Sequence, residues 1–418
     1  MKMMATTPET TKLDAHALRA DFPFLEELLN GKPMAYLDSA VSTQKPRQVL
    51  DAMREFYEHS YTNVHRSVYR LAERATEGFE GARRKVAAFV NAPSEREIVF
   101  TRSATEAINL VAYGWGLDNL GPGDVVVVTE LEHHSNFVPW QFIASRTGAS
   151  FRHIPIDDLG ELQLDALDAI ASEGNVKVVA TGFVSNSLGT INPVEQLAVW
   201  AHDHGAIMIV DAAQAAPHRV VDVQALGCDF LAFSSHKLCG PSGVGALWGR
   251  TELLEAMSPF NLGGEMIRSV ALDRTTFNEL PYKFEAGTPA IAEAYGFGVA
   301  IDYISAIGLD AIEAHEHELL VYTMDRLAEL DFVRVFGPPV DRRAGIVSFE
   351  VAGIHPHDVA QILDWEGIAV RAGHHCTQPL MTRLGIVATT RASFYVYSIP
   401  EEVDRLIEGL HKVKKSLG

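Results

Sequence analysis

A lysine stands where an apolar run ends and a turn begins. The run Phe230 to Phe233 is followed by Ser-Ser-His-Lys, and the chain then breaks at a Gly-Pro pair. This pattern predicts a strand that delivers Ser234, His236 and Lys237 to the end of a sheet. Ligands of open α/β sheets bind at the carboxyl ends of the strands, so these three side chains are candidate ligand-binding residues.

An aspartate follows another apolar strand of the sequence, Ala206 to Val210. Burial of Asp211 would require a cationic or strongly donating partner, because an unpaired buried charge is costly. A protonated pyridine nitrogen is one candidate partner, since a carboxylate beside it would keep the ring an electron sink. Asp211 and Lys237 follow successive apolar strands and can therefore face one cofactor. The alternative is a plain Asp–Lys ion pair at the sheet edge.

Two more polar groups follow strands of the same predicted sheet. Ser-Ala-Thr-Glu opens a helix directly after the strand Ile98 to Thr101. The backbone N–H groups of that helix and the Thr105 hydroxyl predict a seat for a phosphate group, although an ordinary helix cap is the alternative. His133 is the first of two histidines that follow the strand Val125 to Thr129. Its ring could stack on a flat cofactor, and the alternative is a surface or capping histidine.

The stretch Val-Arg-Ala-Gly-His-His-Cys-Thr-Gln-Pro ends at position 379 and holds a cysteine among basic groups. Cys376 lies near Arg371 and two histidines, an electropositive setting that favours a thiolate, so we interpret it as a nucleophile. One alternative is an ordinary loop thiol. The other is a metal site, but the adjacent His374, His375 and Cys376 rarely point at one tetrahedral ion. Arg391 lies in a strand-like run and suits a substrate carboxylate or an internal salt bridge.

Composition and charge narrow the classes of function. The chain has 418 residues, 47% of them hydrophobic, and a formal net charge of −19 with its 35 basic residues scattered. This balance argues against a nucleic-acid or anionic-membrane surface. No segment approaches ~18 consecutive apolar residues and the amino terminus has no signal-peptide pattern, so we expect a cytoplasmic protein. Three cysteines do not make a disulfide framework, and we expect free thiols.

Apolar β-rich runs alternate with helix-like stretches from about residue 97 onward. Strands such as Val125 to Val128 and Ile207 to Val210 are continuously apolar, which is typical of burial on both faces. We therefore predict an α/β fold with a mostly parallel sheet covered by helices. The segment Met257 to Pro289 is rich in Gly, Pro and aromatic residues. It predicts a loop-rich bridge and an oligomer contact.

A second alternation of elements follows this bridge. Its members are helical patterns and strands at Ala290 to Ile307, Leu309 to Leu330, Ile346 to Val351, Ala369 to Ala372 and Glu401 to Leu417. They predict a smaller α+β domain. We expect a large cofactor-binding domain over residues 30–295 and a small domain over residues 1–29 and 296–418 that carries the cysteine loop.

Several motifs along the chain resemble one enzyme family. They are Tyr-Leu-Asp-Ser-Ala, Asn-Val-His-Arg, Glu-His-His-Ser-Asn, Val-Ser-Asn-Ser-Leu-Gly, Val-Asp-Ala-Ala-Gln, Ser-Ser-His-Lys-Leu-Cys-Gly-Pro and Arg-Ala-Gly-His-His-Cys. Together they resemble the class-V, fold-type-I pyridoxal phosphate enzymes, and more narrowly the group II cysteine desulfurases of SufS type. The resemblance runs from about Phe22 to the end of the chain.

The resemblance implies pyridoxal 5′-phosphate as cofactor and a role for each candidate residue. Lys237 would bind the cofactor covalently and carry protons, Asp211 would pair with the ring nitrogen, Gln214 with the ring hydroxyl, and His133 would stack. The phosphate would lie against Thr105, Ser234, His236 and Thr288 of the neighbouring subunit, which implies a homodimer. Asn186, Arg391 and Arg371 would bind the substrate.

The implied reaction converts L-cysteine to L-alanine and leaves a persulfide on Cys376, which would supply sulfur for iron-sulfur cluster assembly. A selenocysteine lyase is the nearest alternative because it shares pocket and cofactor. An aminotransferase or epimerase would not need the cysteine loop, and a docking scaffold would need neither Lys237 nor Cys376. Thr377 departs from the family pattern, since such loops often have alanine after the cysteine.

A short stretch, His-Pro-His-Asp at 355–358, bears on the sulfur acceptor. It resembles the segment of SufS-type enzymes that serve a zinc-bound SufU-type acceptor rather than a SufE-type one. By this resemblance His357 would take over a zinc-ligand position from the partner. The alternative is a polar helix start, since Pro followed by Asp is ordinary there.

Overall fold

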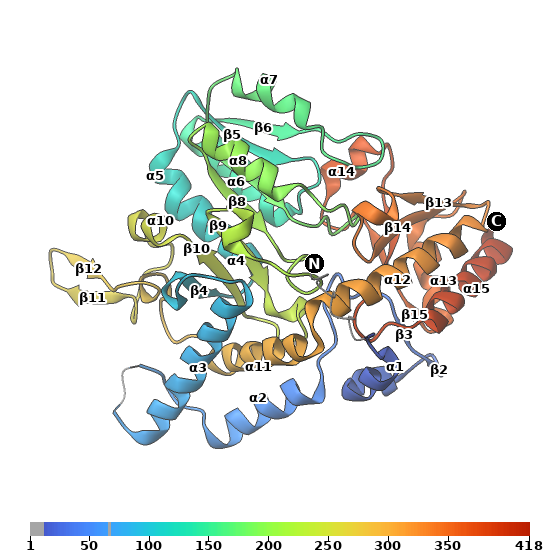
Figure 1. Cartoon of the computed structure of the whole chain (residues 1–418), viewed down its shortest axis with the longest axis horizontal. Helices are drawn as coiled ribbons and strands as arrows, with labels where there is room; N and C mark the ends of the chain where they lie inside the picture. Colours follow the sequence, from blue (N-terminus) through green and yellow to red (C-terminus); the bar gives the residue numbers. More distant parts are fainter. Residues whose placement is uncertain (1–11, 66–67) are drawn as a thin grey trace, which may run out of the picture.

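The computed structural model describes residues 12–65 and 68–418, and its largest element is a seven-stranded sheet (Figure 1). Strand β10 is antiparallel to both of its neighbours, and the pairs from β9 to β6 are parallel. In spatial order the strands are β4 (Ile98–Thr101), β10 (Gly245–Gly249), β9 (Phe230–Ser234), β8 (Ile207–Asp211), β7 (Asn175–Gly182), β5 (Asp124–Thr129) and β6 (Ser150–Ile154).

Helices cover both faces of this sheet. Alternate residues of β5 belong to different cores: Val125 and Val127 pack on one side, and Val126 and Val128 on the other. The first core includes side chains of α3 (Arg70–Phe89), α8 (Val194–Asp203) and α11 (Ile291–Ile307), and the second those of α4 (Ala104–Val111) and α6 (His134–Thr147). The predicted α/β architecture with a mostly parallel sheet is confirmed.

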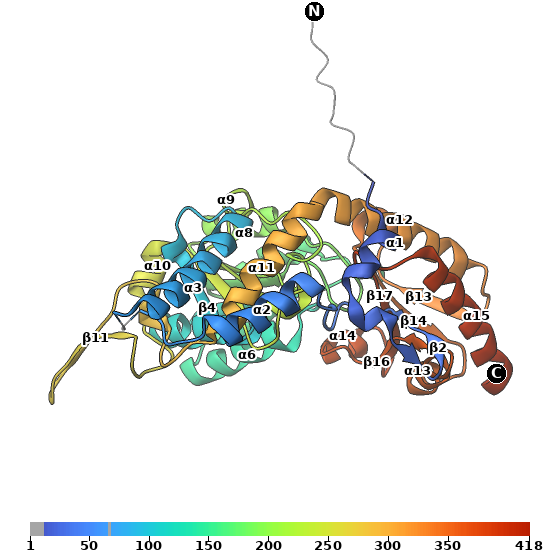
Figure 2. The same cartoon turned by 90° about the horizontal axis from the view of Figure 1, so that it is seen from below.

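A separate four-stranded antiparallel sheet lies beside the seven-stranded sheet (Figures 1 and 2). Its core contains side chains of the sheet and of three helices. The strands in order are β13 (Val333–Phe336), β14 (Ile346–Val351), β17 (Thr389–Ser393) and β16 (Arg371–Gly373), and the helices are α12 (Leu309–Ala328), α13 (Pro356–Trp365) and α15 (Pro400–Leu417).

The amino-terminal segment joins this second part. Arg19 donates to the Tyr397 carbonyl at 2.7 Å and pairs with Glu402 at 2.8 Å, and β3 (Ala35–Tyr36) runs parallel to β15 (Ile368–Ala369). The expected boundary between the two domains, at residues 295 and 296, falls within α11. The domain boundaries stay a prediction. Residues 1–11 of the expected small domain lie outside the described residues.

The structure differs from the sequence analysis in three local features. The run Ala369 to Ala372 was expected to be one strand, but Val370 separates β15 from β16 and the two belong to different sheets. The expected loop-rich bridge contains a hairpin of β11 (Ile267–Val270) and β12 (Thr275–Phe277), which projects from the body (Figures 1 and 2). Strand β10 was not predicted, because glycines stand at both of its ends.

The remaining elements are short or lie at the periphery. They are α1 (Ala15–Leu18), α2 (Arg47–His59), α5 (Leu117–Asn119), α7 (Leu167–Ala171), α9 (Val223–Leu226), α10 (Thr251–Ala256), α14 (Gln378–Arg383), β1 (Leu28–Leu29) and β2 (Lys32–Pro33). Within the described ranges, no single helix is long and apolar enough to cross a membrane. Helices α11 and α12 reach that length and composition only together, and they are bent by 72°.

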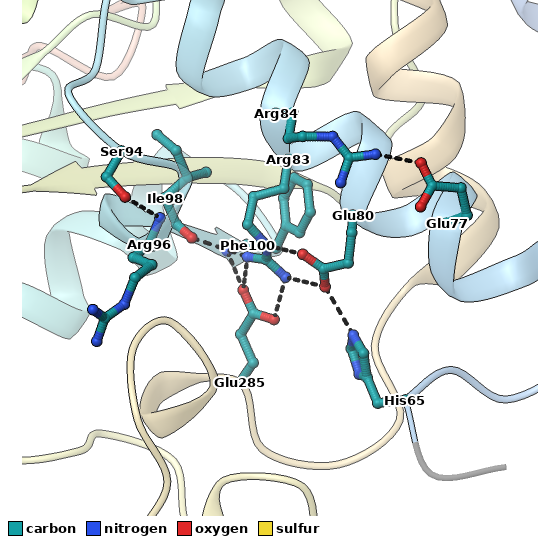
Figure 3. A network of polar contacts seen from close by, with 10 residues as sticks. All are labelled: His65, Glu77, Glu80, Arg83, Arg84, Ser94, Arg96, Ile98, Phe100 and Glu285. Carbon is teal, nitrogen blue, oxygen red and sulfur yellow. Dashed lines mark hydrogen bonds and ion pairs between the residues drawn. The ribbon is translucent and has the colours of Figure 1, made fainter. Parts of the chain in front are cut away.

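A buried ion-pair network closes the outer edge of β4 (Figure 3). The guanidinium of Arg83 is fully buried and binds both carboxylate oxygens of Glu285, at 2.6 and 2.9 Å. Arg83 also donates to the carbonyl of Ile98, and Glu285 accepts from the N–H of Phe100 at 2.7 Å. Two backbone groups of the edge strand are thereby satisfied by side chains rather than by another strand.

Candidate active site

A cavity of about 240 Å³ lies at the carboxyl ends of the parallel strands. The rule that ligands bind at this edge of a sheet predicted the location, and elements of the second sheet also contribute to the wall. The residues that line it include Ala40, Ser103, Thr105, Glu132, His133, Ser135, Asn186, Asp211, Gln214, Ser234, His236, Lys237, Arg371 and Arg391. The structure therefore brings together all but three of the predicted site residues; the exceptions are Cys376, Thr288 and His357.

Lys237 follows β9 in a short turn and Asp211 is the last residue of β8, so neighbouring strand ends place both in the cavity wall. Within the described chain no cation lies close enough to Asp211 for an ion pair, and its carboxylate accepts the Ala213 N–H at 2.9 Å. The plain Asp–Lys ion pair is thus not formed. The surrounding protein lowers the pKa of Lys237 to about 8 through desolvation, which Asp211 partly opposes. Burial raises the pKa of Asp211 above its ordinary value.

A chain of hydroxyl contacts connects the start of α4 to His133. The hydroxyls of Thr105 and Ser135 are 2.6 Å apart, and Ser135 Oγ lies 2.9 Å from Nδ1 of His133. Ser234 Oγ accepts the Ala104 N–H at 2.8 Å, which ties the end of β9 to the same helix start. These groups surround the first turn of α4, where backbone N–H groups favour an anion.

His133 precedes α6 and caps it, because its Nδ1 accepts the Ser135 N–H at 3.0 Å. The capping alternative for this residue is therefore realised, and its ring lies in the cavity wall as well. Burial, with Lys237 nearby, lowers the pKa of His133 to about 3. The ring is therefore neutral near pH 7, and its proton is on Nε2 because Nδ1 accepts.

The loop that carries Cys376 joins β16 to α14 and reaches across to the large sheet. The Cys376 carbonyl accepts the His134 N–H at 2.8 Å, and Arg371 Nη2 lies 3.6 Å from Cys376 Sγ. Burial lowers the pKa of the neighbouring His375 to about 2, so that ring is neutral near pH 7, and His374 Nδ1 accepts the Cys376 N–H. Arg371 is therefore the cation in direct contact with the thiol.

Arg391 and Asn186 both have partners within the chain. Arg391 is fully buried, pairs with Asp38 at 3.1 Å and donates to the Asn186 carbonyl at 2.7 Å. The internal salt bridge that was the alternative for Arg391 is therefore present. Its Nε has no hydrogen-bond partner among the described residues. Asn186 Nδ2 donates to the carbonyl of His375 at 2.6 Å, so this amide holds the cysteine loop.

Two predicted residues lie elsewhere. Thr288 is exposed and lines a second cavity beside Arg102 and Glu106. His357 is exposed at the start of α13, and the cap of that helix is His355, whose Nδ1 accepts the His357 N–H. The stretch therefore forms the helix start that was the alternative, with Pro356 as its first residue and Asp358 in its first turn.

Sequence reasoning missed Glu132, which lines the cavity, and Lys45, which lies outside the cavity wall but contacts the backbone next to Lys237. Glu132 is buried and accepts hydrogen bonds from Thr129 Oγ1, Asn136 Nδ2 and the Gly182 N–H at 2.6 to 2.9 Å. Burial raises its pKa to about 7. Lys45 donates to the His236 carbonyl at 3.1 Å, next to Lys237. The position of Glu132 directly before the two histidines was the available signal; nothing in the sequence marks Lys45.

Metal-ligating side chains do not gather near the cysteine. Across residues 12–65 and 68–418, no group of three or more His, Cys, Asp or Glu side chains is arranged to hold a metal ion. All three cysteines are free; Cys228 and Cys239 are buried, and Cys376 is partly exposed.

Comparisons with known proteins agree with this geometry. The chain is 52% identical over 406 residues to a probable cysteine desulfurase of Halalkalibacterium halodurans, covering 97% of this chain and 99% of the relative. The apo structure of a cysteine desulfurase from Thermococcus onnurineus superimposes with a TM-score of 0.92 at 42% identity, covering 97% of this chain and 99% of that one. The cysteine desulfurase CsdA of Escherichia coli, in its S-sulfonic acid form, gives a TM-score of 0.89 at 38% identity, covering 98% and 100%. The aminotransferase class-V family matches residues 35–406, and the chain belongs to that family.

Proposed function

We propose that this protein is a pyridoxal phosphate-dependent cysteine desulfurase that converts L-cysteine to L-alanine and retains the sulfur as a persulfide on Cys376. One observation carries the proposal: the cavity wall contains Lys237, whose pKa is lowered, and the buried carboxylate of Asp211. The same wall contains Arg371, which contacts the partly exposed thiol of Cys376. Relatives described as cysteine desulfurases along almost the whole chain support it.

The residues of the cavity fit the cofactor. Gln214 Nε2 donates to the Ala40 carbonyl, whereas its buried Oε1 has no partner among the described residues and suits a hydroxyl donor. Asp211 is a buried acceptor with no ion-pair partner among the described residues, which suits a protonated ring nitrogen. Thr105, Ser234 and the first turn of α4 suit a phosphate, with His236 beside them. When bound, pyridoxal 5′-phosphate supplies an aldehyde that captures amines and a ring that accepts electrons.

Lys237 holds the cofactor and moves the proton at the substrate α-carbon. A pKa of about 8 allows its Nζ to accept and release a proton near neutral pH. The neutral ring of His133 offers a flat face without charge, so it stacks without repelling a protonated pyridine. Arg371 and Arg391 are the guanidinium groups of the wall and attract the substrate carboxylate, with Asn186 beside them.

Cys376 takes the sulfur. Its thiolate attacks the sulfur of the bound cysteine: the new S–S bond forms, the Cβ–S bond of the substrate breaks, and protons at Cβ and Cα complete alanine. Arg371 stabilises the thiolate before the attack, since its Nη2 is 3.6 Å from Sγ. The bonds of Asn186 and His134 to the loop keep Cys376 next to Arg371, which lines the cavity.

The functional unit in this proposal is a homodimer in which Thr288 completes the phosphate site of the neighbouring subunit. The exposed position of Thr288, outside the cavity of its own chain, supports this assignment. The projecting hairpin exposes Val270 and Leu272, apolar side chains that suit contact with a second copy. Sedimentation of the holoenzyme tests the dimer: a monomer at micromolar concentration would contradict it.

The persulfide is delivered, in our proposal, to a zinc-bound SufU-type acceptor for iron-sulfur cluster assembly in the cytoplasm, where thiols stay reduced. His357 is exposed, and the carbonyl of the preceding Pro356 accepts from Thr390 at 3.5 Å. Thr390 pairs with Ala372, so α13 begins near the strand that leads into the cysteine loop. Pull-down against SufU-type and SufE-type proteins, with wild type and His357→Ala, tests the preference.

Two measurements on the purified holoenzyme test the activity. We expect alanine to form from L-cysteine and an absorption band at the edge of the visible range, with Lys237→Ala lacking both. Absence of the band in wild type would remove the basis of the cofactor assignment. A band without alanine formation would favour another reaction of the family.

A further inference from the structure

The loop around Cys376 has a backbone conformation that its residues rarely adopt. His375 and Cys376 have φ values of +51° and +59°, in the left-handed region that favours glycine. Two successive non-glycine residues in this region persist only where surrounding contacts hold them. The contacts that hold the loop therefore determine where the thiol is placed.

One of these contacts joins two fully buried hydroxyls from different parts of the fold. Ser187 belongs to the loop after β7, Thr377 follows the nucleophile, and their Oγ atoms are 2.6 Å apart. Thr377 Oγ1 also donates to the His374 carbonyl at 2.9 Å. A hydroxyl has one proton, so Ser187 is the donor of the pair.

The Ser187 side of the contact is itself fixed. Ser348 of β14 donates to the Ser187 carbonyl at 2.6 Å, and the adjacent Asn186 holds the carbonyl of His375. The hydroxyl of Thr377 therefore spans from the His374 carbonyl to a rigid loop of the large sheet. An alanine at this position, as in many similar loops, would leave the Ser187 hydroxyl buried without this acceptor.

We propose that Thr377 is a positioning residue whose bond with Ser187 locks the left-handed turn and keeps the Cys376 thiol beside Arg371. The proposal rests on the desulfurase function of Cys376 and deepens it. With the lock in place the thiol is only partly exposed and contacts Arg371, which lines the cavity. Without it the loop relaxes toward ordinary backbone angles, and the thiol becomes more accessible but less well placed for attack.

The test compares the accessibility of the thiol with its competence in the holoenzyme. Cys228 and Cys239 are fully buried, so iodoacetamide labels Cys376, which mass spectrometry verifies. In Thr377→Val we expect alkylation about fivefold faster, the ratio that corresponds to a hydrogen bond of about 1 kcal/mol. Single-turnover alanine formation at saturating cysteine should fall by a similar factor. Thr377→Ser, which retains the hydroxyl, should restore both rates.

Ser187→Ala removes the same bond from the other side and should reproduce both effects. The double variant Ser187→Ala/Thr377→Val should be no worse than either single change, because they share one interaction. Thr323→Val is the matched control: Thr323 is equally buried, but its hydroxyl bonds only the carbonyl of Leu319 within α12. It should leave the alkylation rate unchanged.

Wild-type alkylation rates in both Thr377→Val and Ser187→Ala would overturn the lock, and so would effects that multiply in the double variant. If Thr377→Val does not fold, Ser187→Ala alone carries the comparison. Alkylation requires no desulfurase activity, so a wild-type enzyme that forms no alanine would contradict the proposed function and leave the lock still testable.

Discussion

Arg371 Nη2 lies 3.6 Å from Cys376 Sγ, and it is the cation in contact with that thiol in the described structure. Arg371 is fixed in β16, which pairs with β17 through Arg371 and Arg391. The backbone of Arg371 is therefore fixed by strand pairing, and its guanidinium extends from the strand to the thiol. A thiolate next to a fixed cation is the arrangement that an attacking sulfur requires.

Replacing Arg371 by methionine should therefore slow persulfide formation. Loss of a contact between a thiolate and a cation is expected to cost about 1.5 kcal/mol, or roughly tenfold in the single-turnover rate at saturating cysteine. Alkylation of Cys376 by iodoacetamide at pH 7 should slow as well. Arg334→Met is the matched control, because that arginine lies on β13, is 64% exposed and pairs with Glu350 rather than contacting the thiol. Equal rates in Arg371→Met and wild type would contradict the role of Arg371.

Capture of the cofactor by the apo protein should depend on pH through Lys237. The folded protein lowers the pKa of this amine to about 8, so the neutral, nucleophilic form increases as the pH rises through that value. We expect the rate of appearance of the cofactor band to rise from pH 7 to pH 9 and then to level off. An ordinary lysine would titrate near pH 10.4.

Asp211→Asn is the informative variant for this titration. Asp211 opposes the desolvation of Lys237, so its neutralisation should move the midpoint to lower pH. Stopped-flow absorbance over pH 6.5 to 10 gives both midpoints. A midpoint near pH 10 in wild type, or no shift in the variant, would show that the two groups are not coupled as described.

Cys376→Ala should separate desulfuration from selenocysteine cleavage. We expect alanine formation from L-cysteine to fall at least about 100-fold, because the sulfur has no acceptor. Alanine formation from selenocysteine should persist, because selenium leaves more readily than sulfur. The absorbance change on adding cysteine should also persist, which shows that binding is intact. Equal loss with both substrates would indicate that Cys376 is needed for more than sulfur abstraction.

The buried pair Arg83–Glu285 should matter for stability far more than its exposed neighbour (Figure 3). Glu285→Gln leaves the fully buried Arg83 charge with a weaker partner at the edge of β4, and we expect a loss of about 3 kcal/mol in the free energy of unfolding. The Arg84–Glu77 pair on the same helix has side chains 49% and 75% exposed. Glu77→Gln should therefore cost less than about 1 kcal/mol. Denaturant unfolding of the holoenzymes measures both, and similar losses would contradict this ranking.

The strand-end residues could be predicted from the sequence because parallel strands bring their carboxyl ends to one edge. Asp211 and Lys237 follow continuous apolar strands. Their proximity could therefore be predicted from the apolar pattern of the strands and the fold class alone. The division of β15 from β16 could not be predicted, since it depends on which strand of each sheet is available to pair. Strand β10 was missed because its glycine ends read as a loop.

The contacts that hold the cysteine loop could not be predicted from the sequence either. Ser187 and Thr377 are distant along the chain, and nothing in either motif indicates that their hydroxyls meet. The same holds for Arg391, whose pairing with Asp38 competes with the predicted carboxylate role. Residue types indicated the chemistry, whereas the partners of each group depend on how the two sheets meet.

Acid stability should depend on Glu80, which lies between His65 and Arg83 (Figure 3). Burial alone would raise its pKa, but the bonds from His65 and Arg83 outweigh burial and lower the pKa to about 2. A carboxyl group whose folded pKa is depressed stabilises the fold above its unfolded pKa of about 4.3, and this contribution is lost as the pH falls toward 2. We therefore expect Glu80→Gln to lower the free energy of unfolding at pH 7 and to flatten its decline between pH 4.5 and pH 2.

Glu77, exposed on the same helix, is the control, because its replacement should leave the slope unchanged. Denaturant midpoints measured across this range decide the matter: a slope in Glu80→Gln as steep as in wild type would show that other carboxylates carry the acid transition.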